Sequence, residues 1–249
     1  MAQIRPGSHF RNMAFNSSRT EFLQNRFVIS YRSFTCMETD NLVETSSVNC
    51  DDLIKSSQEF ATELLLKELP QGFCFHNLIH TQNVVHAAEV LSREEHISKE
   101  EKGIVLVSAG FHDTGYTRRY IGHETASVEI ATSFLKYHGV AERKIQQVVD
   151  CILATRLGAT ATTVTEHILQ DADLFHLGHD DYFSFLSLLR TELETQLGKV
   201  MEDRQWLTKN VEFLLRHQYN TTYGRTVLDI KKQHNLELNR KLLDAHSSS

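Results

Sequence analysis

The consecutive residues His112 and Asp113 can both bind a metal ion, and they follow the apolar run Gly103-Ile-Val-Leu-Val-Ser-Ala-Gly-Phe111. Charged groups at the inner end of a buried helix are costly unless something binds them. Upstream lies Phe75-His-Asn-Leu-Ile-His80, and downstream lies Asp171-Ala-Asp-Leu174. The three motifs carry imidazoles and carboxylates in the order His, His-Asp, Asp. We expect them to meet around one divalent cation.

The spacing within each motif is compatible with such a site. His76 and His80 are four residues apart, so a helical turn would place both imidazoles on one side. The side chains of His112 and Asp113 diverge by about 100° around a helix, which at a helix end suits two neighbouring coordination positions. Asp171 and Asp173 lie in an apolar stretch, so at least one of them should face inward.

Two imidazoles and two carboxylates make a mixed nitrogen and oxygen site. Such a site favours Mn, Mg, Fe, Co or Zn with positions kept open for water, unlike a closed thiolate zinc site. A divalent ion of this kind lowers the pKa of a water molecule and polarises a phosphoryl oxygen. Phosphoester hydrolysis needs both effects, so these residues predict a metal-dependent phosphohydrolase.

Composition and charge narrow the classes of partner. Residues 1–36 carry five arginines and one glutamate, so their +4 leaves −10 for the remainder of a chain with net charge −6. An acidic body argues against a nucleic-acid polymer as partner, and it is compatible with a small anionic substrate that a metal neutralises. The longest apolar run, about eight residues, is too short to span a membrane. The four cysteines show no CxxC spacing, which favours reduced thiols and a cytoplasmic protein.

The first 50 residues form the expected extension. They are rich in Ser, Asn, Thr and Arg without sustained periodicity, so we expect residues 1–50 to be disordered and residues 51–245 to form the domain. An Arg-rich, acid-poor start is also typical of a mitochondrial targeting peptide. A further alternative is an upstream extension, with Met37 as the functional start.

Helical patterns follow one another from Asp51 onward. The first ends at Pro70, Asn77 can cap a second that runs to about Glu95, and Ser98-Lys-Glu-Glu101 is a capping box that opens the apolar helix. The chain therefore predicts a single all-α helical bundle. Further helices are expected at about 124–138, 141–157, 165–177, 180–197, 202–218 and 225–243.

The ordered motifs resemble the HD-domain superfamily of metal-dependent phosphohydrolases, which is named for its His-Asp pair. The resemblance covers roughly residues 73–180, with the helical tail to 243 as a possible extension, and it implies an HD-type all-α domain. It assigns metal binding to His80, His112, Asp113 and Asp173. Asp173 is preferred to Asp171 because the ligand of the superfamily follows a small residue in an Ala-Asp-Leu setting.

Two further resemblances suggest roles in catalysis. The segment from Phe75 to His80 is similar to the Tyr-His-Asn-x-x-His segment of cyclic-nucleotide phosphodiesterases, which implies that His76 protonates the leaving oxygen. Phe111-His-Asp-Thr-Gly-Tyr116 and Gly122-His-Glu124 look like predicted HD phosphohydrolases related to nucleotide signalling. They imply a small phosphorylated substrate, a nucleotide or cyclic nucleotide first and simple phosphomonoesters next. The catalytic candidates are His76, His123 and Asp113.

Several assignments stay open at this stage. Arg118 and Arg119 are candidates to bind the substrate phosphate, and two solvated arginines in an exposed loop are the alternative. Asp171 is either a residue that orients a ligand or a surface acid. His123 is a possible ligand of a second metal ion, but Thr155 stands where several relatives place a further histidine, so one ion or two stays undecided.

Two other classes of function remain alternatives. The first is a non-catalytic sensor of HD fold that binds nucleotide or metal. The second is a di-iron oxygenase of the same fold, against which Thr155 weighs. The chain has Thr114-Gly-Tyr116 instead of the His-Asp-x-x-Glu-Asp form of stringent-response hydrolases, so guanosine tetraphosphate hydrolysis is not expected.

Overall fold

The computed structural model describes residues 49–247, which belong to a compact unit spanning Thr45–Ser249. The regular elements of this described part are helices, so the all-α prediction is confirmed. Three expectations concern residues 1–50: disorder, a mitochondrial targeting peptide, or a start at Met37. Residues 1–48 lie outside the described part, and Asn49 and Cys50 begin the first helix. The α-helices are α1 (Cys50–Glu68), α2 (Leu78–Glu94), α3 (Lys99–Phe111), α4 (His123–Tyr137), α5 (Glu142–Ala154), α6 (Val164–Asp173), α7 (Tyr182–Leu197), α8 (Asp203–Arg216) and α9 (Asp229–Ser247).

Side-chain caps fix the starts of the two helices that lead to the predicted site. The Asn77 carboxamide oxygen accepts the backbone N–H groups of Ile79 and His80 at the start of α2. At the start of α3, Ser98 and Glu101 form the expected capping box, in which each side chain satisfies the backbone of the other. Both predicted starts are confirmed, and they set where His80 and His112 lie along their helices.

The structure differs from the expected helix ends after α5 and α6. Helix α5 stops at Ala154, and the Thr155 hydroxyl donates to the carbonyl of Ile152. Helix α6 stops at Asp173 and continues as a 3₁₀ turn, Phe175–Gly178, in which Leu177 N–H donates to the carbonyl of Leu174. Hydrogen bonds between residues i and i+3, as in a 3₁₀ turn, tighten the last turn of a helix. The chain therefore turns immediately beyond Asp173.

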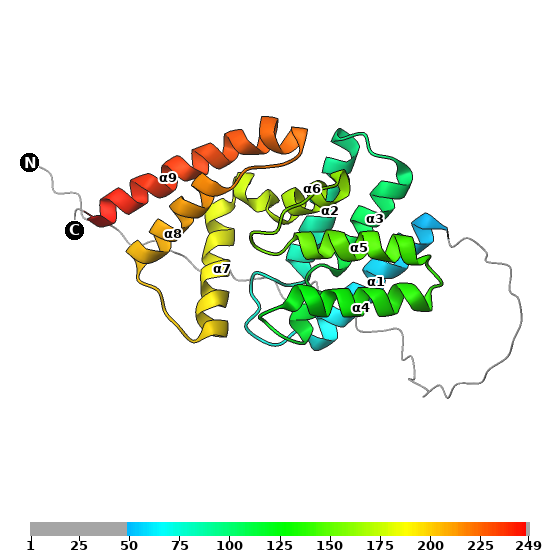
Figure 1. Cartoon of the computed structure of the whole chain (residues 1–249). Helices are drawn as coiled ribbons and strands as arrows, with labels where there is room; N and C mark the ends of the chain where they lie inside the picture. Colours follow the sequence, from blue (N-terminus) through cyan, green and yellow to red (C-terminus); the bar gives the residue numbers. More distant parts are fainter. Residues whose placement is uncertain (1–48, 248–249) are drawn as a thin grey trace, which may run out of the picture. The chain divides into compact units, whose positions relative to one another are not determined.

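Helix α3 lies at the centre of the main hydrophobic core. Every residue from Gly103 to Phe111 is buried, because α1, α2, α5 and α6 pack around α3. Figure 1 shows α4 and α5 side by side on one side of this group. The ends of α3 and α6 thus meet inside the packed helices.

A second hydrophobic core joins α7, α8 and α9. Tyr182, Trp206, Leu214 and Leu236 are buried in it, and α8 and α9 lie side by side (Figure 1). No helix of the described residues 49–247 is long and apolar enough to cross a membrane.

Acidic side chains fasten the segment that precedes α9 to the first core. The Asp171 carboxylate on α6 accepts the backbone N–H groups of Asn220 and Thr221 and the Thr221 hydroxyl. Glu95, at the end of α2, accepts the backbone N–H groups of Thr222 and Tyr223. The helix that bears Asp173 is therefore tied directly to the C-terminal helices.

Candidate metal centre

The predicted metal ligands come together in the structure. His80 of α2, His112 at the end of α3 and Asp173 at the end of α6 each offer one ligand atom, and the three atoms lie within 4.8 Å of one another. The Nε2 atom of His80 is 3.1 Å from Asp173 Oδ1, and His112 Nε2 is 3.6 Å from the same oxygen. His80 and Asp173 are 93 positions apart along the chain, so the fold brings these residues together.

Asp113 adds a second carboxylate to this cluster. Its Oδ2 atom lies 3.4 Å from His80 Nε2 and 3.3 Å from His112 Nε2. We call His80, His112, Asp113 and Asp173 the ligand cluster. It has the two imidazoles and two carboxylates that the sequence motifs predicted.

Two buried atoms of the ligand cluster have no hydrogen-bond partner, namely His112 Nε2 and Asp113 Oδ2. The other ring nitrogen of His112, Nδ1, lies 2.8 Å from the carbonyl of Ala109 and can donate to it. A neutral imidazole protonated at Nδ1 presents a lone pair at Nε2. Buried polar atoms without partners are costly, and a divalent cation would satisfy both of them. The residues therefore fit a metal ion.

The electrostatics of the ligand cluster keep its carboxylates negative. Burial would raise the pKa of Asp173, but the imidazoles of His112 and His80, 3.6 and 3.1 Å from its Oδ1 atom, together outweigh burial and hold that pKa well below its usual range. Burial would also raise the pKa of Asp113, yet the neighbouring imidazoles of His112, His76 and His80 together reverse the direction and lower it. Two anionic carboxylates in a largely buried site attract a cation more strongly than they would in water.

His76 is held beside the ligand cluster by a residue that sequence reasoning missed. The fully buried Glu192 of α7 accepts the backbone N–H groups of Phe75 and His76, and its Oε1 atom lies 2.5 Å from His76 Nδ1. Burial would lower the pKa of His76, but the hydrogen bond with Glu192 and the charges of the nearby carboxylates, those of Glu192, Asp113 and Asp173, together outweigh burial and raise it. The available signal was the position of Glu192 three residues after Leu189, on the inward face of α7.

His123 reaches the ligand cluster from the first residue of α4. Its Nε2 atom lies 3.5 Å from Asp113 Oδ1, on the carboxylate oxygen that does not approach His80. The ring of Tyr116 stacks on the His123 ring with centroids 3.8 Å apart, and it lies 4.8 Å from the His76 ring. Tyr116 thus separates and orients the two histidines that were predicted to move protons.

A glycine allows this arrangement. A Cβ atom on Gly115 would lie 1.9 Å from the carbonyl oxygen of His123, so the turn Thr114–Thr117 can dock on the start of α4 only with glycine there. The Gly115 N–H donates to the Ser127 hydroxyl at 2.8 Å, which fastens the turn to α4.

The structure places the predicted arginines on a carboxylate of α4. Arg118 and Arg119 both pair with Glu129, at 3.1 and 3.2 Å, and about half of each side chain is exposed. A different guanidinium group approaches the His123 end of the site. Arg156 pairs with Glu124 at 3.8 Å and donates to the hydroxyl of Thr125. The role of Arg118 and Arg119 in binding phosphate remains a prediction.

Two further open assignments can be compared with the structure. Asp171 is buried and holds the segment before α9, so the reading as a surface acid is wrong. Thr155 lies beyond α5 and bonds to the backbone of its own helix.

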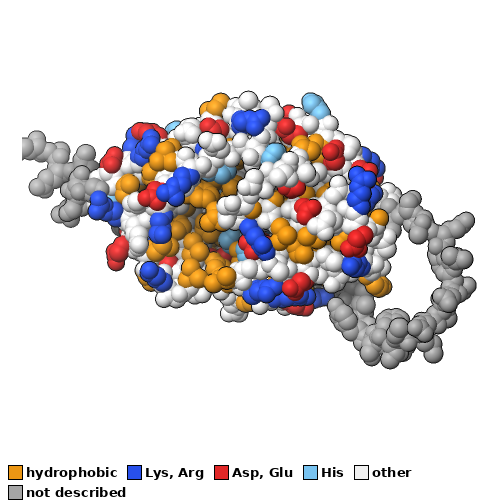
Figure 2. All heavy atoms as spheres, viewed as in Figure 1, with side chains coloured by type: hydrophobic (Ala, Val, Ile, Leu, Met, Phe, Trp, Pro, Cys, Tyr) orange, Lys and Arg blue, Asp and Glu red, His pale blue; other side chains and the backbone are white. Residues whose placement is uncertain are grey.

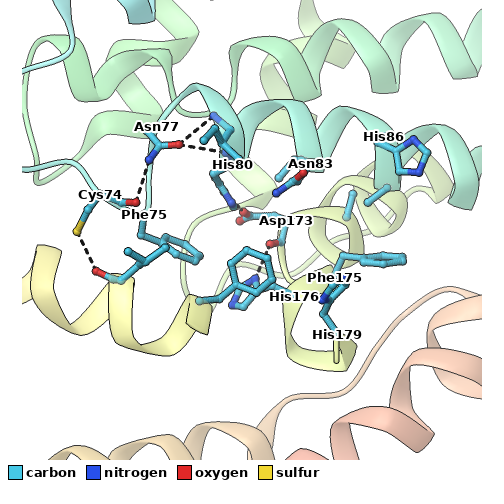
Figure 3. A pocket seen from close by; sticks show the side chains of 16 residues that line it. Cys74, Phe75, Asn77, His80, Asn83, His86, Asp173, Phe175, His176 and His179 are labelled. Carbon is cyan, nitrogen blue, oxygen red and sulfur yellow. Dashed lines mark hydrogen bonds and ion pairs between the residues drawn. The ribbon is translucent and has the colours of Figure 1, made fainter. Parts of the chain in front are cut away.

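A cavity of about 270 Å³ opens beside the ligand cluster, between α2, the end of α6 and α7. Figure 3 shows His80 and Asp173 pointing toward each other on its wall, with Phe75 and His176 close by. Burial, together with the nearby His80, lowers the pKa of His176 to about 4. Because His80 and Asp173 line this cavity, the ligand cluster can be reached through it.

Comparisons with known proteins show a shared fold. No family model and no curated protein matches this chain. The crystal structure of the Lin1889 protein from Listeria innocua is similar, with a TM-score of 0.56 and 16% sequence identity over 78% of this chain and 96% of that one. Identity this low establishes likeness of fold alone.

Proposed function

We propose that the protein is a metal-dependent phosphohydrolase that cleaves a phosphoester of a small substrate, with a nucleotide or cyclic nucleotide as the preferred class. The observation that carries the proposal is the ligand cluster with its two buried atoms that lack partners, His112 Nε2 and Asp113 Oδ2. Its geometry is compatible with the HD-type ligand set that the sequence resembles.

His80, His112, Asp113 and Asp173 would hold the divalent ion. Once bound, such an ion would lower the pKa of a water molecule and polarise a phosphoryl oxygen. Metal analysis of the purified protein would identify the ion among Mn, Mg, Fe, Co and Zn. The same analysis would show whether one ion or two are bound.

The remaining residues supply proton transfer and orientation. Because Glu192 engages Nδ1 of His76, the second ring nitrogen of His76 is free to give a proton to the leaving oxygen. General acid catalysis of this kind contributes about 10²- to 10⁴-fold in rate. His123 lies against Asp113, where it can exchange a proton with a nearby water. Glu192 is a positioning residue, since it acts through His76.

A direct test compares turnover of a panel of nucleotides, cyclic nucleotides and phosphomonoesters with each divalent metal. Activity is expected to disappear with chelator and in His112→Ala and Asp113→Ala, and to survive in His234→Ala, which changes an exposed histidine of α9. Circular dichroism would verify that each variant is folded. Unaltered turnover in both site variants would reject the mechanism, and tight nucleotide binding without turnover under any metal would favour the sensor alternative.

A further inference from the structure

The wall of the cavity beside the ligand cluster is mainly apolar and aromatic. Three phenylalanines reach it from separate elements: Phe75 before α2, Phe175 in the turn after α6, and Phe185 of α7. Ile79 and Leu188 also line it and are 65% and 41% exposed, as expected for residues at its mouth. Figure 2 shows hydrophobic side chains gathered around a hollow on this face, with histidine visible inside it.

The same wall contains no permanent positive charge. None of its sixteen residues is a lysine or an arginine, and the one carboxylate among them is Asp173. The arginines of neighbouring elements are engaged by carboxylates elsewhere, Arg118 and Arg119 by Glu129 and Arg156 by Glu124. The remaining polar side chains of the wall are amides, imidazoles and a thiol, including Asn83 and His86.

This composition discriminates between classes of phosphoester. Sites that bind polyphosphates recruit several cationic side chains, because each additional phosphate brings charge that must be neutralised. A wall without such groups leaves the charge of a second or third phosphate without a cationic partner, which is costly where that phosphate is buried. An uncharged ring gains instead by burial against phenylalanine.

On these grounds, and resting on the proposed phosphohydrolase function, we propose that the cavity binds the uncharged, ring-bearing part of a substrate that carries a single phosphate group. The cavity of about 270 Å³ is slightly smaller than typical ligand sites, which span roughly 300–1,000 Å³. It therefore suits one ring system. Aryl phosphomonoesters and nucleoside monophosphates fit this class, whereas nucleoside triphosphates and inorganic pyrophosphate do not.

The test measures kcat/KM of the metal-loaded full chain for four compounds: p-nitrophenyl phosphate, a nucleoside 5′-monophosphate, a nucleoside 5′-triphosphate and inorganic pyrophosphate. We expect the two monophosphates to exceed the other two at least tenfold. In Phe185→Ala, kcat/KM for p-nitrophenyl phosphate should fall about tenfold or more, while kcat/KM for the small ester glycerol phosphate should stay within about twofold.

The matched control is Leu197→Ala, which removes an exposed apolar side chain from the same helix outside the cavity. Phe185→Leu retains an apolar side chain and keeps the test valid if the alanine variant does not fold. The proposal is overturned if pyrophosphate or the triphosphate is the preferred substrate, or if Phe185→Ala lowers turnover of both monoesters equally.

A separate measurement covers the case in which no phosphoester is turned over with any metal. That result would reject the proposed function, and calorimetric titration with phenylphosphonate would then test the cavity by itself. Binding to the wild type that weakens in Phe185→Ala would support the ring-binding class, whereas absence of binding to the wild type would overturn it.

Discussion

The Oε1 atom of Glu192 lies 2.5 Å from Nδ1 of His76, although 116 residues separate them in the sequence. This contact joins α7 to the segment that enters α2. A carboxylate that is fully buried and accepts two backbone N–H groups as well is fixed in place, so it orients the imidazole and favours its protonated form.

Replacing Glu192 tests the importance of this pairing. In Glu192→Gln the amide oxygen can still accept backbone N–H groups, but the negative charge that raises the pKa of His76 is lost. We expect kcat to fall about 100-fold or more. Because protonated His76 would then persist only to a lower pH, the alkaline limb of the pH–rate profile should move to lower pH. Glu212→Gln, at an exposed position of α8, is the control, and an unshifted limb in Glu192→Gln would contradict the role.

Metal binding should stabilise the fold, because the ligand cluster forms only in the folded state. A divalent ion at 100 times its Kd is expected to add about 2.7 kcal/mol to the free energy of unfolding. The increase should be lost in Asp173→Asn and retained in Asp180→Asn, which changes an exposed aspartate. Thermal melts with and without metal measure both. Equal stabilisation of the wild type and Asp173→Asn would place the ion elsewhere.

Gly115 and Gly110 differ in the space that surrounds them, so alanine should have opposite effects on stability at the two positions. Gly115→Ala would press a methyl group into the backbone of His123, so we expect a loss of about 1–3 kcal/mol in the free energy of unfolding, together with reduced activity. At Gly110, within α3, a Cβ would lie 3.7 Å from Gln58, an ordinary contact. Gly110→Ala should stabilise by about 0.5–1 kcal/mol. Urea unfolding of both variants is the measurement, and equal effects would refute the steric argument.

The partly buried imidazole of His217 gives a pH-dependent prediction. Burial, with Lys232 nearby, lowers its pKa to about 4, and its Nδ1 atom has no hydrogen-bond partner. An unfolded histidine binds a proton near pH 6.5, so between pH 6.5 and 4 the unfolded state takes up the proton and stability falls as the pH falls. The loss is about 3 kcal/mol. His217→Phe should reduce this loss, which urea unfolding at pH 7 and pH 4.5 would detect. The same change at the exposed His234 should leave the pH dependence as it was.

Local sequence signals predicted the helices and the convergence of the four side chains of the ligand cluster, whose binding of a metal stays a prediction. Asn77 and the Ser98–Glu101 capping box mark where α2 and α3 start, and because helical geometry is regular, these starts also fix His80 and His112 along their helices. The approach of His80 and His112 to Asp173 is a contact between separate helices. It could be expected only from the rule that the apolar faces of those helices turn toward a common core.

Other parts of the site depend on packing between distant elements. Glu192 lies in a helix with ordinary amphipathic spacing, and its role follows from how α7 docks against residues 75–76. Arg118 and Arg119 follow the His-Asp pair in sequence. Both nevertheless pair with Glu129, which lies in the second turn of the adjacent helix α4. Nearness in sequence therefore gave no information on which guanidinium approaches His123.

The bond between Asp171 and residues 220–221 has a consequence for the smallest piece of this protein that can fold on its own. Asp171 is 1% exposed, and a chain that ended before Asn220 would leave its carboxylate facing an apolar interior with its hydrogen bonds gone. A group in that position costs several kcal/mol, and Asp173 sits two residues away on the same helix. A fragment that folds on its own must therefore include residues 220 and 221, well past the stretch that carries the histidines and aspartates themselves.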